Sequence, residues 1–118
     1  MSIKERFEAM KKSGVEVPRP LEVLGGLDEK LALAHMDSKA ATFVPGALPV
    51  KYKALFAISA AVALDSVACI QNNVKLARQS GATKAEIMEA IEVARFAKAA
   101  TIVSASAPAL EWLANQPD

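Results

Sequence analysis

The chain has 118 residues, of which 53% are hydrophobic and only 5% aromatic, and its formal net charge is +1. This length fits one domain with a modest, aliphatic core. The 14 basic and 13 acidic residues give no basic excess that would favour nucleic acid. The single cysteine excludes an internal disulfide framework and is typical of a reducing compartment. The N-terminal segment is charged from Lys4 on and lacks the apolar stretch of a signal peptide, so we expect a cytoplasmic protein.

Two helices and a linker are predicted in the first part of the chain. An apolar stripe with charged residues around it predicts a short amphipathic helix over residues 2–13. Two prolines and the Gly25–Gly26 pair predict a linker over residues 15–26. Asp28 is a good N-cap residue and predicts a second helix over Glu29–Thr42.

The middle of the chain carries the longest apolar run, Ala54–Leu64, in a helix that begins near Val50. A helix that is apolar all round is buried on most sides, in a domain core or between subunits. The run is shorter than the roughly 20 residues that cross a bilayer, so no membrane partner is expected. Asp65 and Ser66 interrupt it, and an amphipathic helix follows to Ser80.

Thr83 and Glu86 form a T-x-x-E capping box, which predicts the start of another helix that reaches about Ala105. Pro108 predicts the first turn of a last short helix anchored by apolar residues such as Trp112. There is no strand signal. The fold class is therefore all-α, with about five to six helices in one domain over residues 1–118 and a core at 46–106.

Cys69 is expected in the first turn of the helix that follows the apolar one. A helix N-terminus stabilises a thiolate through its dipole and free N–H groups, which favours a nucleophilic or redox thiol. Cysteine is also a common small, buried hydrophobe, so a packing role stays open. The side chains four residues before and after it are Asp65, whose charge opposes a thiolate, and Asn73, which does not titrate.

His35 is the only histidine and is either a general base or a hydrogen-bonded boundary residue. His35 and Cys69 match no zinc spacing, so no metal site is expected. No phosphate-binding loop or nucleophile elbow is present, and the sequence implies no cofactor. The charged residues Lys51, Lys53 and Arg78 are expected to face solvent.

The stretch from Gly46 to Ala94 resembles the carboxymuconolactone decarboxylase family, which includes the alkylhydroperoxidase D (AhpD)-like proteins. The resemblance is carried by the order of four features: the apolar helix, the cysteine-bearing helix, the A-x-x-x-G-A-T turn from Ala77, and the E-I-x-E-A-x-x-V-A run from Glu86. It implies a compact all-α domain whose apolar helices pack into homotrimers or homohexamers.

The resemblance also implies a site. Redox-active members carry C-x-x-C, a histidine four residues after the second cysteine, and a glutamate twelve residues before the first. On this sequence the second cysteine falls on Cys69, the first on Ser66, the histidine on Asn73 and the glutamate on Ala54. Only Cys69 keeps the chemistry of its position, because Ser66 cannot resolve an oxidised thiol and neither Asn73 nor Ala54 titrates.

Three functions remain open on this basis. The first is a thiol-dependent peroxidase or disulfide reductase, an antioxidant activity in which Cys69 is the sole redox group. An external thiol, or Cys69 of another subunit, would resolve it. The second is a non-catalytic oligomer that binds a small ligand or partner in the remaining pocket. The third is a cofactor-free decarboxylase-like lyase, for which His35 or Lys53 would supply a base or cation.

Overall fold

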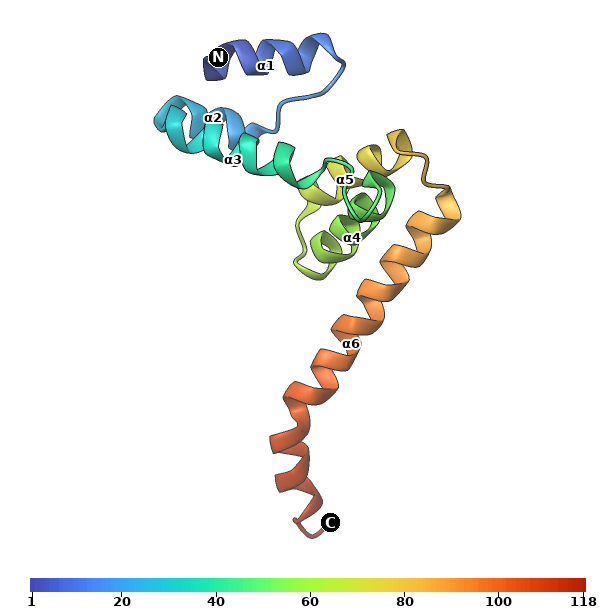
Figure 1. The fold of residues 1–118 in the computed structure, drawn as a ribbon. Coiled ribbons are helices and arrows are strands. Elements are labelled where there is room, and N and C mark those ends of the chain that lie inside the picture. Colours follow the sequence, from blue (N-terminus) through green and yellow to red (C-terminus); the bar gives the residue numbers. More distant parts are fainter. The chain divides into compact units, whose positions relative to one another are not determined.

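The computed structural model describes all residues from Met1 to Asp118 and contains six helices. The predicted all-α class is confirmed. The chain forms two compact units, residues 1–44 and residues 45–118, and the organisation as a single functional domain stays a prediction. Figure 1 labels the helices, which are α1 (Ile3–Lys12), α2 (Arg19–Leu27), α3 (Glu29–Thr42), α4 (Val50–Ala63), α5 (Val67–Gln79) and α6 (Lys84–Ala114).

The predicted linker over residues 15–26 is wrong in its second half, where α2 forms. Pro20 lies in the first turn of this helix, where backbone N–H groups have no intrahelical partner, so proline costs little there. Gly25 lies inside the helix for a packing reason. A Cβ atom at Gly25 would lie 3.2 Å from Ile3 and 3.3 Å from Phe7, so the missing side chain lets α1 pack closely on α2.

The second unit is organised around α4, whose inner side is made of small residues. Ala54, Ile58 and Ala61 on this side are buried, and α5 and α6 both pack on it. Ser59 Oγ donates a hydrogen bond to the Ala90 carbonyl of α6 at 2.8 Å. Burying an isoleucine such as Ile58 stabilises a fold by about 1.5–3 kcal/mol. The packing of α5 and α6 on α4 is therefore a main source of the unit's stability.

The apolar run is buried on one side only within this chain. The other side of α4 is open, and Phe56 and Leu64 there are 58% and 79% exposed. Burial on most sides, as the sequence predicts, would therefore require a second surface from outside the unit.

Helix α6 continues to Ala114 and does not end near Ala105. Pro108 is inside it and cannot donate to the carbonyl of Ser104. Water can satisfy that carbonyl because the helix is exposed at this point. The predicted anchor Trp112 is 65% exposed and anchors nothing within the chain. No helix combines the length and the apolar character needed to span a membrane.

The two connections within the second unit depend on left-handed backbone conformations. Asp65 has φ +57° in the turn between α4 and α5, where Asp is one of the few side chains that tolerate such a value. Gly81 has φ +93° directly after α5, as a glycine at C′ commonly does. Thr83 then caps α6 through the predicted box with Glu86.

We expect Gly81→Ala to destabilise the second unit by about 1 kcal/mol, because a Cβ atom strains a positive φ even where space is free. The matched control is Gly46→Ala, which lies at an ordinary φ and brings its Cβ only to 3.7 Å from Lys53. Urea denaturation of both variants measures the effect. Equal midpoints for Gly81→Ala and the native chain would contradict it.

Candidate functional site

Cys69 lies in the first turn of α5, as the sequence predicts, and its side chain is exposed. The interpretation of Cys69 as a small core hydrophobe is therefore wrong for this chain. The backbone N–H groups of Val67, Ala68 and Cys69 make no hydrogen bond to a carbonyl. Free N–H groups and the helix dipole favour a negative charge at this end of α5. The thiol thus has solvent access and donors beside it.

Ser66 and Asn73 lie on the same side of α5 as Cys69, at spacings of three and four residues. Ser66 is the N-cap residue, yet its hydroxyl makes no capping hydrogen bond. Both side chains are half-buried. A hydroxyl and an amide can donate hydrogen bonds to an anion, but neither can relay a proton at neutral pH.

Ala54 is fully buried in the core, with Ala77 and Ile87 among its cluster. This is the position where the resemblance places a glutamate. A carboxylate at a fully buried, alanine-lined position would be costly without a partner. The structure therefore gives Ala54 a packing role beside the site.

Lys98 supplies a positive charge that sequence reasoning missed. Its Nζ lies 2.7 Å from Asp65 Oδ2, in the turn directly before Ser66. This ion pair offsets the carboxylate whose charge opposes a thiolate at the start of α5. The two residues are 33 positions apart, so no local pattern links them.

Lys51 also departs from the prediction of a solvent-facing side chain. It is 28% exposed and pairs with Glu86 at 3.0 Å, which joins the start of α4 to the start of α6. Its Nζ also lies 5.2 Å from the ring of Tyr52. The Glu86 hydrogen bond raises the pKa of Lys51. The hydrogen bond from the Thr83 backbone, followed by that from Lys51, lowers the pKa of Glu86.

His35 and Lys53 lie on helices other than α5, which carries Cys69. His35 is exposed on α3 in the first unit, so the boundary interpretation is the nearer one. Lys53 is half-buried in the first turn of α4. Arg78 is exposed, as predicted, and it also donates a hydrogen bond to the Ala82 carbonyl at 2.9 Å, which stabilises the α5–α6 turn.

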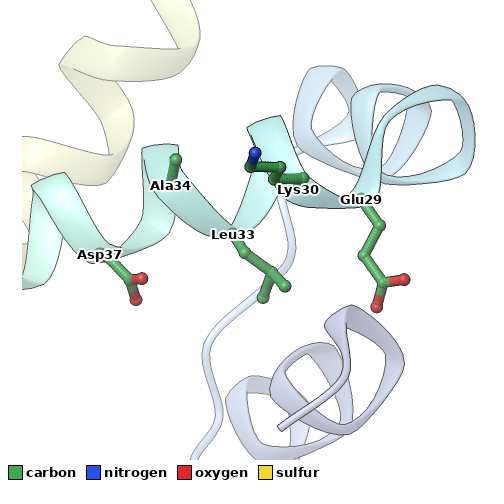
Figure 2. A pocket seen from close by; sticks show the side chains of 5 residues that line it. All are labelled: Glu29, Lys30, Leu33, Ala34 and Asp37. Carbon is green, nitrogen blue, oxygen red and sulfur yellow. The ribbon is translucent and has the colours of Figure 1, made fainter.

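An open hollow lies beside α3, and the two carboxylates that line it already have structural partners. Figure 2 shows Glu29, Leu33 and Asp37 pointing to the same side of the helix. Glu29 accepts a hydrogen bond from the Ile3 backbone at 2.9 Å, and Asp37 pairs with Arg6. These carboxylates therefore fasten α1 to α3. No group of three or more metal-ligating side chains is found in the chain.

We expect iodoacetamide to alkylate Cys69 in the native protein at a rate within about tenfold of that in the urea-unfolded protein, because the side chain is exposed. Intact mass spectrometry over time gives both rates. Alkylation that begins only after unfolding would mean that Cys69 is covered in solution.

The Lys51–Glu86 pair predicts a pH-dependent contribution to stability. The raised pKa of Lys51 means that the ion pair stabilises the folded state fully at pH values below the ordinary pKa of 10.5. This stabilisation is lost as the pH rises through the pKa of Lys51 in the folded protein. The lowered pKa of Glu86 means that its interactions stabilise the folded state fully at pH values above the ordinary pKa of 4.5. This stabilisation is lost as the pH falls through the pKa of Glu86 in the folded protein. Lys51→Met should therefore lower the urea midpoint most at pH 7.

The control for this change is Lys75→Met, which removes an exposed lysine of α5. Urea midpoints at pH 3, 7 and 11 test whether the ion pair stabilises the protein most near neutral pH. Equal losses for Lys51→Met at all three pH values would show that packing, and not the ion pair, is responsible.

Comparison with known proteins identifies the family of this chain. The sequence profile of the Carboxymuconolactone decarboxylase family matches residues 28–112, which includes α3 as well as the Cys69 region. No curated protein gives a significant match. The family match covers most of the chain and agrees with the six-helix, strand-free structure. The chain belongs to the carboxymuconolactone decarboxylase family, in which the AhpD-like proteins are found.

Proposed function

We propose that the protein is a thiol-dependent oxidoreductase of the AhpD-like type, with a site reduced to the single cysteine Cys69. The observation that carries the proposal is the exposed position of this thiol in the first turn of α5. A thiol used only for packing would be buried. Three free backbone N–H groups, and the Ser66 hydroxyl, which makes no capping hydrogen bond, can donate hydrogen bonds to a negative charge there.

The chemistry is peroxide reduction in two halves. The Cys69 thiolate attacks one peroxide oxygen, the O–O bond breaks, and the other oxygen leaves as an alcohol or water after taking a proton. Cys69 is thereby oxidised to a sulfenic acid. The donors at the α5 N-terminus and the Ser66 hydroxyl stabilise the thiolate and the sulfenate.

Reduction requires an external thiol because Ser66 stands where a resolving cysteine would be. The sulfur of that thiol attacks the sulfenic sulfur, water leaves, and a mixed disulfide forms. A second external thiol then attacks this disulfide and releases Cys69 as a thiol with an external disulfide. In disulfide reduction, the Cys69 thiolate attacks the substrate disulfide, one half of the substrate leaves as a thiol, and Cys69 forms a mixed disulfide with the other half. One external thiol then attacks the Cys69 sulfur and releases that second half as a thiol, and a second external thiol releases Cys69 as a thiol together with an external disulfide.

The proposal includes a cytoplasmic, reducing compartment and assembly into a homotrimer or homohexamer through apolar helices. A reducing compartment supplies the external thiol and keeps Cys69 reduced. Assembly is supported by the open apolar side of α4, where Phe56 and Leu64 are exposed.

Cys69→Ser should abolish peroxide consumption that depends on added thiol, a loss of more than about 100-fold, because a serine hydroxyl is a far weaker nucleophile at neutral pH. Asn73→His should raise the rate about tenfold or more by placing a proton acceptor four residues after the thiol. Steady-state peroxide loss with a small dithiol as reductant measures both.

The control for the second variant is Gln79→His, which adds the same side chain at an exposed position at the other end of α5. Undiminished peroxide consumption by Cys69→Ser would rule out the redox function. A non-catalytic, ligand-binding oligomer, supported by the non-titrating Ala54, Ser66 and Asn73, would then be the better explanation. Release of CO₂ from a lactone acid by the same variant would instead favour a lyase.

A further inference from the structure

Asp65 is the only residue other than glycine that has a positive φ in this chain. Its φ is +57°, and it lies directly before Ser66, the N-cap residue of the helix that carries Cys69. Backbone held in this region by a residue with a side chain costs energy, and such residues gather at functional sites. The position of Asp65 next to the proposed site therefore points to a function for its side chain.

The charge of Asp65 works against the thiol that it precedes. Asp65 comes four residues before Cys69, so the carboxylate and the thiol both belong to the start of α5. An ionised carboxylate and a thiolate are like charges, and each makes the ionisation of the other less favourable. An Asp65 without a partner would therefore lower the fraction of Cys69 that is ionised.

Lys98 supplies the opposite charge from another helix. The last buried residue of α6 is Ala94, and Lys98 follows one helical turn later on the same side. From there its Nζ donates a hydrogen bond to Asp65 Oδ2 at 2.7 Å. Because the packing of α6 holds this part of the helix in place, the ammonium group is delivered to the turn before α5.

We infer that Lys98 is a positioning residue for the Cys69 thiol and that it acts through Asp65. It holds the Asp65 side chain and neutralises its charge, so that Cys69 can ionise at the start of α5. The inference rests on the proposed function, in which the Cys69 thiolate is the nucleophile, and it adds a residue of α6 to the site.

The exposure of the ion pair sets the size of the effect. The side chains of Lys98 and Asp65 are 46% and 79% exposed. A unit charge about 8 Å away in water changes an ionisation equilibrium about two- to threefold. Salt of about 1 M screens charges over roughly 3 Å and should remove such an effect. Exposed ion pairs contribute little to stability, so variants that lack this pair should stay folded.

The alkylation rate of Cys69 in the full-length protein at pH 7 and low salt tests the inference. Iodoacetamide is neutral, so the charges act on the thiol and not on the reagent. Lys98→Met should slow alkylation about two- to threefold, and Lys98→Arg should keep the native rate. Adding Asp65→Asn to Lys98→Met should restore the native rate, because asparagine also tolerates a positive φ and carries no charge. At about 1 M salt the rates should converge.

The matched control is Lys84→Met, which removes an exposed lysine at the first position of α6 and should leave the rate unchanged. Circular dichroism confirms that each variant keeps its helices. If the ion pair only fastens the turn, the double variant stays as slow as Lys98→Met, because the fastening is still missing. That result overturns the inference, as does a native rate for Lys98→Met.

Peroxide consumption separates this inference from the proposed function. The rates of Lys98→Met and of the double variant with peroxide should follow the order of their alkylation rates. Undiminished peroxide consumption by Cys69→Ser overturns the proposed function, whatever the alkylation rates are. Consumption that needs Cys69, together with a native alkylation rate in Lys98→Met, overturns the role of Lys98 alone.

Discussion

The packing of two helices on the small-residue side of α4 is the contact on which the second unit depends. Alanines at 54 and 61 with Ile58 between them form a shallow surface that α5 and α6 can approach closely. The hydrogen bond from Ser59 to the Ala90 carbonyl satisfies the only polar side chain on the apolar run. Because small side chains build this contact, larger or charged residues at these positions would separate the helices. The fully buried Ala54 is one of them, so its small side chain serves this packing.

This packing fixes the start of α5 and therefore the thiol. The chain leaves α4, turns through Asp65 in a left-handed conformation and enters α5 at Ser66. Lys98 of α6 binds that turn, so all three helices of the unit meet around it. Cys69 lies one turn further on, exposed, with free backbone donors beside it. In the proposed function, this thiol is the nucleophile, the free donors stabilise an anion, and groups from outside the chain supply proton transfer and thiol resolution.

Local signals in the sequence predicted much of this structure. Asp28 and the Thr83–Glu86 box marked helix starts correctly because capping depends on residues three or four positions apart. The linker predicted over residues 15–26 rests on the rule that prolines and glycine pairs break most helices. Here α2 forms from Arg19 to Leu27, because one proline lies in its first turn and Gly25 permits a close approach. The ion pairs of Lys51 and Lys98 were beyond prediction, since their partners come from distant parts of the chain. The exposure of Cys69 was likewise a question of packing, which helical periodicity alone leaves open.

The most direct measurement is the mass of the intact native protein after one equivalent of peroxide, before and after a small thiol is added. If Cys69 is the redox centre, the mass first rises by one oxygen atom and then changes to that of a mixed disulfide. Excess thiol returns the protein to its starting mass, and Cys69→Ser shows none of these steps. A native protein whose mass does not change with peroxide, or whose added oxygen lies on methionine, would contradict a function based on Cys69.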